Sequence, residues 1–205
     1  MHAMKKLRAF VFVCFCFAAA APQAPGSDEK SYFPLQAGNE WAYGERSQFS
    51  ANERITVKVD KVIGNAWFKI LNYNGDMHWI RRTLSGAVYE WPLRLWYRLA
   101  TPTGAQWHMT LNDDAAHGGI ACSNGASLQV VSRDETVMVP AGIFSTVHIQ
   151  FSTSCNDAGI TGEWFAEGVG LVKRELTSFA GPVTMELLQA KINGGTIGDA
   201  AYELR

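Results

Sequence analysis

The sequence lacks the local patterns that mark the commonest enzyme and metal sites. It has no Gly-x-Ser-x-Gly segment to hold a nucleophilic serine, and no histidine has a second histidine two or four residues away. Such spacings place catalytic or metal-binding side chains on one face of an element. We therefore predict no catalytic residue, no metal ligand and no cofactor from local motifs.

Charged residues are also scarce, at 18 % of the 205 residues, whereas hydrophobic residues make up 47 %. This balance is typical of a globular chain with enough length for one domain and its core. The net charge is −1, and no stretch is rich in Lys and Arg. Nucleic-acid binding is not expected, because it needs a basic surface.

The N-terminus holds an apolar run that is too short to anchor the chain permanently in a membrane. This run, Leu7–Phe17, follows a short basic stretch and precedes four alanines. The order is typical of a secretory signal peptide, cleaved after Ala20 or as late as Ala24. Cleavage removes three of the 18 basic residues and leaves 15 against 19 acidic ones. We therefore expect a mildly acidic protein, exported to the periplasm or the extracellular space, without a transmembrane segment.

Only two of the four cysteines remain once the leader is removed. Cys14 and Cys16 belong to the leader, and neither follows a small residue, so a lipoprotein signal is disfavoured. Cys122 and Cys155 would enter an oxidising compartment, where we predict that they pair. The bridge would close a loop of roughly 34 residues and contribute about 3–4 kcal/mol in the chain-entropy model.

Apolar and polar residues alternate with the period of a β-strand. Ile55–Val59 is a clear case, and Gly64-Asn65 and Asn74-Gly75 are two-residue hairpin signals. About a dozen such strands, separated by turn residues, predict an all-β fold with one antiparallel domain. A strongly curved sheet or half-barrel and a two-sheet sandwich both fit. The expected organisation is a signal peptide at 1–21, a mobile spacer at 22–31, the β domain at 32–193 and a C-terminal tail at 194–205.

The most specific pattern lies between Glu135 and Leu176. Its parts are Glu135-Thr136-Val137, the predicted turn Pro140-Ala141-Gly142 with Ile143-Phe144, and Trp164-Phe165-Ala166-Glu167-Gly168-Val169-Gly170-Leu171-Val172. With the opening Phe33-Pro34-Leu35, Gly38, Trp41 and Tyr43, these segments resemble a family of secreted bacterial proteins that have no established activity. The resemblance implies an exported all-β domain, similar to the curved half-barrels of lipoprotein-carrier proteins. It implies no reaction.

Aromatic residues supply the main candidate for binding. Seven tryptophans are many for this length, and the residues that could line a ligand site are Trp91, Trp96, Tyr97, Trp107 and Trp164. The first hypothesis is a non-catalytic domain that binds an apolar or amphipathic ligand, or a partner at the cell envelope. The second is a carbohydrate-binding module with coplanar, exposed tryptophans, and it uses Trp91, Trp96 and Trp107. The competing interpretation is that these rings simply fill a β core.

Polar residues support only a weaker third hypothesis, a hydrolase assembled from distant strands. It requires His78, His108, His117 or His148 within hydrogen-bond reach of a carboxylate in a cleft. The loop 112–117 lacks the ligand spacing of a calcium site. Glu163 and Glu167 flank Trp164, but four residues along a strand place them about 13 Å apart, too far for a glycosidase pair.

One mass measurement on the exported protein tests the leader and the disulfide together. We expect the chain to begin after Ala20 or Ala24, and Cys122 and Cys155 to be alkylated only after reduction. Alkylation of the native, unreduced protein would show that the two thiols are free.

Overall fold

The structure is a computed structural model, and it describes residues 31–47, 51–63, 67–73, 76–109, 125–153 and 159–198. Every regular element in these ranges is a β-strand. The first group is β1 Glu40–Ser47, β2 Ala51–Ile63, β3 Trp67–Tyr73, β4 Asp76–Arg82, β5 Ala87–Glu90 and β6 Arg94–Arg98. The second group is β7 Gln106–Met109, β8 Ala126–Val139, β9 Gly142–Thr153, β10 Gly159–Ala166, β11 Gly170–Ser178, β12 Gly181–Ile192 and β13 Gly195–Gly198.

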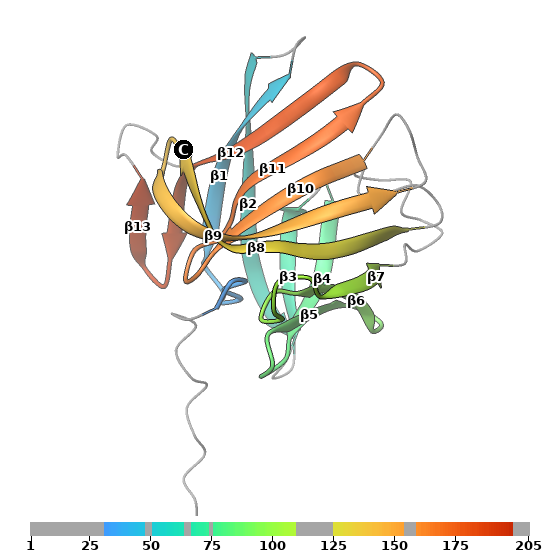
Figure 1. The fold of residues 1–205 in the computed structure, drawn as a ribbon. Helices are drawn as coiled ribbons and strands as arrows, with labels where there is room; N and C mark the ends of the chain where they lie inside the picture. The colour runs from blue at the N-terminus through green and yellow to red at the C-terminus, as the bar shows by residue number, and fades with distance from the viewer. Residues whose placement is uncertain are drawn as a thin grey trace, which may run out of the picture.

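All strands belong to one antiparallel sheet, in which nearly every strand pairs with its neighbour in sequence. The order is β6-β5-β4-β3-β2-β1-β12-β11-β10-β9-β8-β7, and β13 pairs with β12 outside this path. The pairing of β1 with β12 is the long-range contact that joins the two halves. The sheet curls until β3 and β4 lie behind β8, β9 and β10 (Figure 1). The all-β class is therefore confirmed, as a single sheet nearly closed into a barrel.

The two edge strands, β6 and β7, meet where the barrel nearly closes. The indole nitrogen of Trp107 donates a 2.9 Å hydrogen bond to the carbonyl of Trp96 across this seam. One guanidinium nitrogen of Arg133, on β8, donates to the carbonyls of Leu99 and Thr101, both at 2.7 Å. Because Leu99 and Thr101 follow β6 directly, these bonds tie the β6–β7 connection to β8. The seam thus uses side chains in place of a backbone ladder.

The segment before β1 fills one end of the interior. Phe33 and Leu35 are buried, and the Phe33 ring lies 5.9 Å from Tyr97 and 6.3 Å from Phe165. The amide of Gly168 donates to the carbonyl of Ser31 at 2.9 Å. The folded part therefore includes Ser31, which we had assigned to the spacer, because this residue is held by the β10–β11 turn.

Side-chain alternation follows the expected period of two. On β9, Val147, Ile149 and Phe151 are buried, whereas His148 and Gln150 face outward. The turn after Pro140 forms as predicted, with Gly142 at φ 144°. β8 is one continuous strand, although its register with β9 shifts twice between Val130 and Glu135.

The sheet also continues beyond residue 193, where we had placed the end of the domain. β13 pairs with Gln189–Ile192 and so occupies the edge of β12 beyond the end of β11. Cys122 and Cys155 lie outside the described residues, so their pairing stays a prediction. Within the described part of the chain, no helix could cross a membrane.

Replacement of Arg133 by methionine tests the seam. The change keeps the length of the apolar stem but removes two charged hydrogen bonds, so we expect the free energy of unfolding to fall by about 2 kcal/mol. Urea denaturation measures this loss. Arg98→Met is the matched control, because Arg98 is exposed on β6, and it should cost less than about 0.5 kcal/mol. Equal losses in both variants would contradict the role of Arg133.

Candidate functional site

The five predicted aromatic residues do not gather at one surface. Trp96, Tyr97, Trp107 and Trp164 are all at most 8 % exposed, and only Trp91 is open to solvent, at 60 %. Trp96 and Trp107 lie in the interior beside the seam. The platform of coplanar exposed rings expected from Trp91, Trp96 and Trp107 is therefore not formed. Most of these rings fill the core, as the competing interpretation held.

Trp91 instead belongs to a group of aromatic residues on the outside of the barrel. Trp67, Trp79 and Trp91 come from β3, β4 and the end of β5, and they alternate with buried residues such as Ile80. The rings of Trp67 and Trp91 meet edge to face, with centroids 5.4 Å apart and planes at 76°. The guanidinium of Arg81 lies 5.2 Å from the centre of the Trp67 ring. We call Trp67, Trp79, Arg81 and Trp91 the outer aromatic face.

Trp67 and Trp79 were missed as binding candidates, although the sequence contains the signal that finds them. Asn74-Gly75 is a hairpin signal in the sequence, and β3 pairs with β4 so that Lys69 lies opposite Trp79. Trp67 and Lys69 lie two residues apart, so their side chains share one face of β3. Since Ile70 and Ile80 are buried, the tryptophans must lie on the opposite side of the sheet.

The interior near the turn between β5 and β6 holds a polar cluster around Glu90. One carboxylate oxygen accepts a 2.6 Å hydrogen bond from Nδ1 of His78. The other accepts bonds from the Trp96 indole, at 2.9 Å, and from Arg94. Burial raises the pKa of the Glu90 carboxyl, but the hydrogen bond from His78 and the charges of His78 and Arg94 outweigh it and hold the pKa below 4.5. Glu90 is therefore a carboxylate fixed by three donors.

A second buried acid, Glu163, lies on the interior face of β10. Its carboxylate accepts a 2.7 Å hydrogen bond from Nε of Arg174 on β11. Burial dominates and raises the pKa of Glu163 above 4.5, although Arg174 and Tyr97 partly offset it. Glu167 lies exposed in the β10–β11 turn. The two glutamates therefore do not form a catalytic pair.

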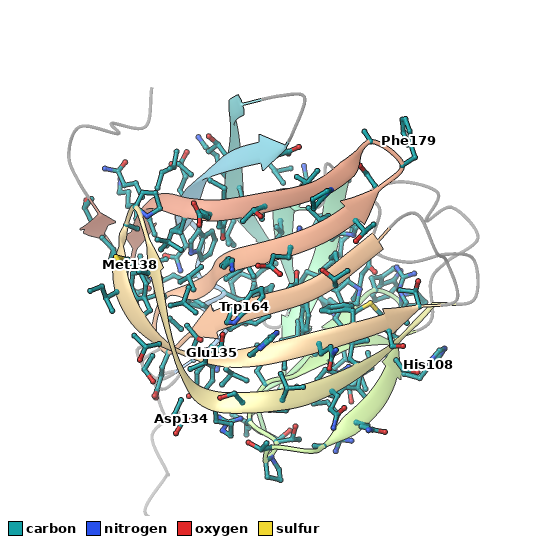
Figure 2. The ribbon with its side chains drawn as sticks, turned by 45° about the horizontal axis from the view of Figure 1, so that its top comes forward. His108, Asp134, Glu135, Met138, Trp164 and Phe179 are labelled. Atoms are coloured by element: carbon teal, nitrogen blue, oxygen red, sulfur yellow. The ribbon has the colours of Figure 1, made fainter. Side chains whose placement is uncertain are left out.

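Trp164 is buried on the outer side of the sheet by its neighbours on adjacent strands. Its indole nitrogen donates to Glu135 at 2.9 Å, and the same carboxylate accepts from Nδ1 of His148 at 2.9 Å. The His148 ring stacks on Trp164 at 4.1 Å, and the Lys173 ammonium lies 4.4 Å from the centroid of the Trp164 ring. Figure 2 shows Trp164 and Glu135 on this face. The cluster joins β8, β9, β10 and β11.

Gly162 provides the space for the Trp164 ring. A Cβ atom at this position would lie 2.9 Å from Cη2 of Trp164 and 3.2 Å from Nε2 of His148. Any side chain at residue 162 would therefore displace the stacked pair. The resemblance motif Trp164-Phe165 thus has a packing role here, with Trp164 outward and Phe165 in the core.

Two histidines lie within hydrogen-bond reach of a carboxylate, which is one part of the hydrolase hypothesis, but they do not form one site. His78 lies on β4 with Glu90, and His148 lies on β9 with Glu135. Both carboxylates also accept an indole N–H, which ties the pairs to the packing of the sheet. His108 is exposed on β7, and His117 lies outside the described residues. Within the described ranges, no three His, Cys, Asp or Glu residues gather as metal ligands.

One described cavity in the barrel interior is too small for a ligand. A cavity of ≈ 20 Å³ is lined by residues that include Phe33, Trp41, Tyr43 and Leu171. This volume holds about one water molecule. The indole of Trp41 and the hydroxyl of Tyr43 already donate to the carbonyls of Val169 and Leu171, at 2.7 and 2.9 Å. The polar groups of Trp41 and Tyr43 beside this cavity are therefore already used in hydrogen bonds within the fold.

No protein-family model matches the chain, and no curated protein matches it. Two solved structures are similar. One is a "putative exported protein with YmcC-like fold" from Bacteroides fragilis, with TM-score 0.46, 14 % identity, and coverage of 79 % of this chain and 99 % of that one. The other is a "putative lipoprotein" from Parabacteroides distasonis, with TM-score 0.38 and the same identity and coverage. The class of this protein is defined by its own structure: an all-β, nearly closed antiparallel barrel.

The lowered pKa of Glu90 predicts that the folded protein loses stability at acid pH. Below pH 4.5 the unfolded chain takes up a proton at this residue while the folded protein does not, so stability falls as the pH drops through the folded-state pKa. Glu90→Gln removes this contribution. Its free energy of unfolding should therefore change less steeply with pH than that of the wild type below pH 4.5, by at most about 1.4 kcal/mol per pH unit. Urea denaturation across a pH series measures both slopes.

Glu163→Gln is the matched comparison, because its contribution has the opposite sign. Above pH 4.5 the folded protein keeps a proton that the unfolded chain releases, so this residue makes stability fall as the pH rises through its folded-state pKa. In Glu163→Gln, the free energy of unfolding should no longer show this fall as the pH rises. If Glu90→Gln and Glu163→Gln changed the slope of unfolding free energy against pH in the same way and in the same pH window, the opposite pKa directions given for the two residues would be wrong.

Proposed function

We propose that this protein is an exported, non-catalytic β-domain that binds an amphipathic ligand at its outer aromatic face. Export is supported by the basic, apolar and alanine-rich order of residues 1–21. The binding role is supported by the exposed tryptophan at the end of β5. The small volume of the described cavity favours a ligand on the outside of the barrel.

The observation that carries the proposal is the exposure of Trp91 beside a second ring. A tryptophan that is 60 % exposed leaves a large apolar surface in water, and Trp67 extends that surface through an edge-to-face contact. Leu93, in the same turn, is 64 % exposed, and Met77 at the start of β4 is 45 % exposed. Exposed apolar groups that lie close together mark binding surfaces more often than single exposed residues do.

The geometry favours an alkyl chain over a sugar ring. Sugar binding uses the flat face of one ring or of coplanar rings, whereas Trp67 and Trp91 stand at 76° to each other. Arg81 also covers one side of Trp67. A flexible chain can follow an angled pair of rings, and its burial is driven by apolar area without any need for coplanarity.

Replacement of Trp91 by alanine tests this surface. We expect the affinity for a monomeric ten-carbon alcohol, decanol, to fall about tenfold, because a contact with a large aromatic side chain is lost. Isothermal titration calorimetry measures the dissociation constant without relying on tryptophan fluorescence.

Phe179→Ala provides the matched control. Phe179 is an aromatic residue that is 95 % exposed, but it lies in the turn between β11 and β12. Its removal should leave decanol binding unchanged. Failure of the wild-type protein to bind decanol or decanoate, or an equal loss in both variants, would overturn the proposal.

A further inference from the structure

Arg81 is a cation of the outer aromatic face whose charge is not neutralised by an acid in the described structure. Its side chain is partly buried, and its guanidinium lies 5.2 Å from the centre of the Trp67 ring. The ion pairs formed among the described residues do not include Arg81. Charged groups that are partly withdrawn from water are usually paired with an opposite charge. The charge of Arg81 is therefore free to attract an anion.

The terminal nitrogens of Arg81 can be reached from solvent. Of the Arg81 nitrogens, only Nε is both buried and without a hydrogen-bond partner. None of the hydrogen bonds within the described ranges starts from the two terminal nitrogens, so these atoms are not enclosed by the fold. They are the donors that a guanidinium offers to an anion.

The register of the sheet surrounds Arg81 with aromatic side chains. Arg81 pairs with Tyr89 on β5, and Trp79 lies two residues away on the same face of β4. Trp67, on β3, lies between the cation and the exposed ring, 5.2 Å from the Arg81 guanidinium and 5.4 Å from the centroid of Trp91. A ten-carbon chain with its head at Arg81 can therefore pass along Trp67 to Trp91 while it stays outside the barrel.

The charges on this side of the sheet also favour an anion. Lys69 lies opposite Trp79, so a second cation shares the face of Arg81. Residues 67–98 contain five Lys and Arg residues against two Asp and Glu, although the whole chain carries −1. One of the two acids, Glu90, lies on the interior side of the sheet, where it accepts a hydrogen bond from His78. The local field outside β3 and β4 is therefore positive.

We propose that Arg81 binds the anionic head group of an amphipathic ligand whose alkyl chain lies on Trp67 and Trp91. This inference rests on the proposed function and names the head group that the same surface recognises. Guanidinium groups bind carboxylates and phosphates through short, charge-assisted hydrogen bonds. The aromatic rings beside Arg81 bury the chain but offer no partner for the charge, so the ligand supplies it.

Decanoate and decanol separate the head group from the chain. We expect monomeric decanoate to bind the full-length mature protein about tenfold more tightly than decanol at neutral pH, as the gain of a charge-assisted hydrogen bond predicts. Because salt screens exposed charges, this advantage should be smaller in about 1 M than in about 0.01 M sodium chloride. Isothermal titration calorimetry measures both affinities. The comparison uses the wild-type protein and needs no variant to fold.

Arg81→Met removes the charge and the donors but keeps an apolar stem beside Trp67. It should weaken decanoate binding about tenfold and leave decanol binding unchanged. Arg98→Met is the matched control, because it removes the same charge from an exposed position on β6. It should leave the affinity for both ligands unchanged.

The outcomes distinguish this inference from the proposed function. Equal affinity of the wild type for decanoate and decanol would overturn the role of Arg81 while leaving the proposed function intact. Decanoate binding that survives Arg81→Met, in a variant that unfolds at the wild-type temperature, would overturn it in the same way. So would an equal loss of decanoate binding in Arg98→Met. Binding of neither ligand would overturn the proposed function as well.

Discussion

A sheet of twelve strands that curls on itself encloses more volume than aliphatic side chains can fill, and this constraint shapes the whole molecule. Aromatic rings occupy much of that volume: Tyr97 packs against Phe165, with centroids 5.0 Å apart, and Phe33 contacts both. The filling comes from both halves of the sheet and from the segment before β1. Because these rings occupy the interior, the most exposed tryptophan lies outside it.

The same constraint explains the buried ionic groups. Glu163 with Arg174, and Glu90 with Arg94 and His78, are long side chains that pair with one another on the interior side of neighbouring strands. Buried charge is tolerated only where each group has partners. Both clusters meet that condition in part, since buried polar atoms without a hydrogen-bond partner remain on Arg94 in one and on Glu163 in the other.

The seam between β6 and β7 shows how the fold manages its open edges. Edge strands present unpaired backbone groups that invite pairing with other chains. Here Trp107 and Arg133 occupy backbone carbonyls at and just after β6. The closure is made by side chains from β7 and β8, so the sequence of β6 itself does not predict it. Local periodicity finds the strands, but it does not show which of them form the ends of the sheet.

The sequence alone determined the class of the fold and much of its local structure. Period two, the Asn74-Gly75 hairpin and the turn at Pro140 each depend on neighbouring residues, and such short-range preferences can be read directly. Only the tertiary structure decided which face of each strand is inside. The local sequence does not distinguish Trp91 from Trp96, yet Trp91 is exposed and Trp96 is buried. The exposure of each ring depends on tertiary contacts, because Trp96 lies where β7 meets β6 at the seam, whereas Trp91 lies in the β5–β6 turn.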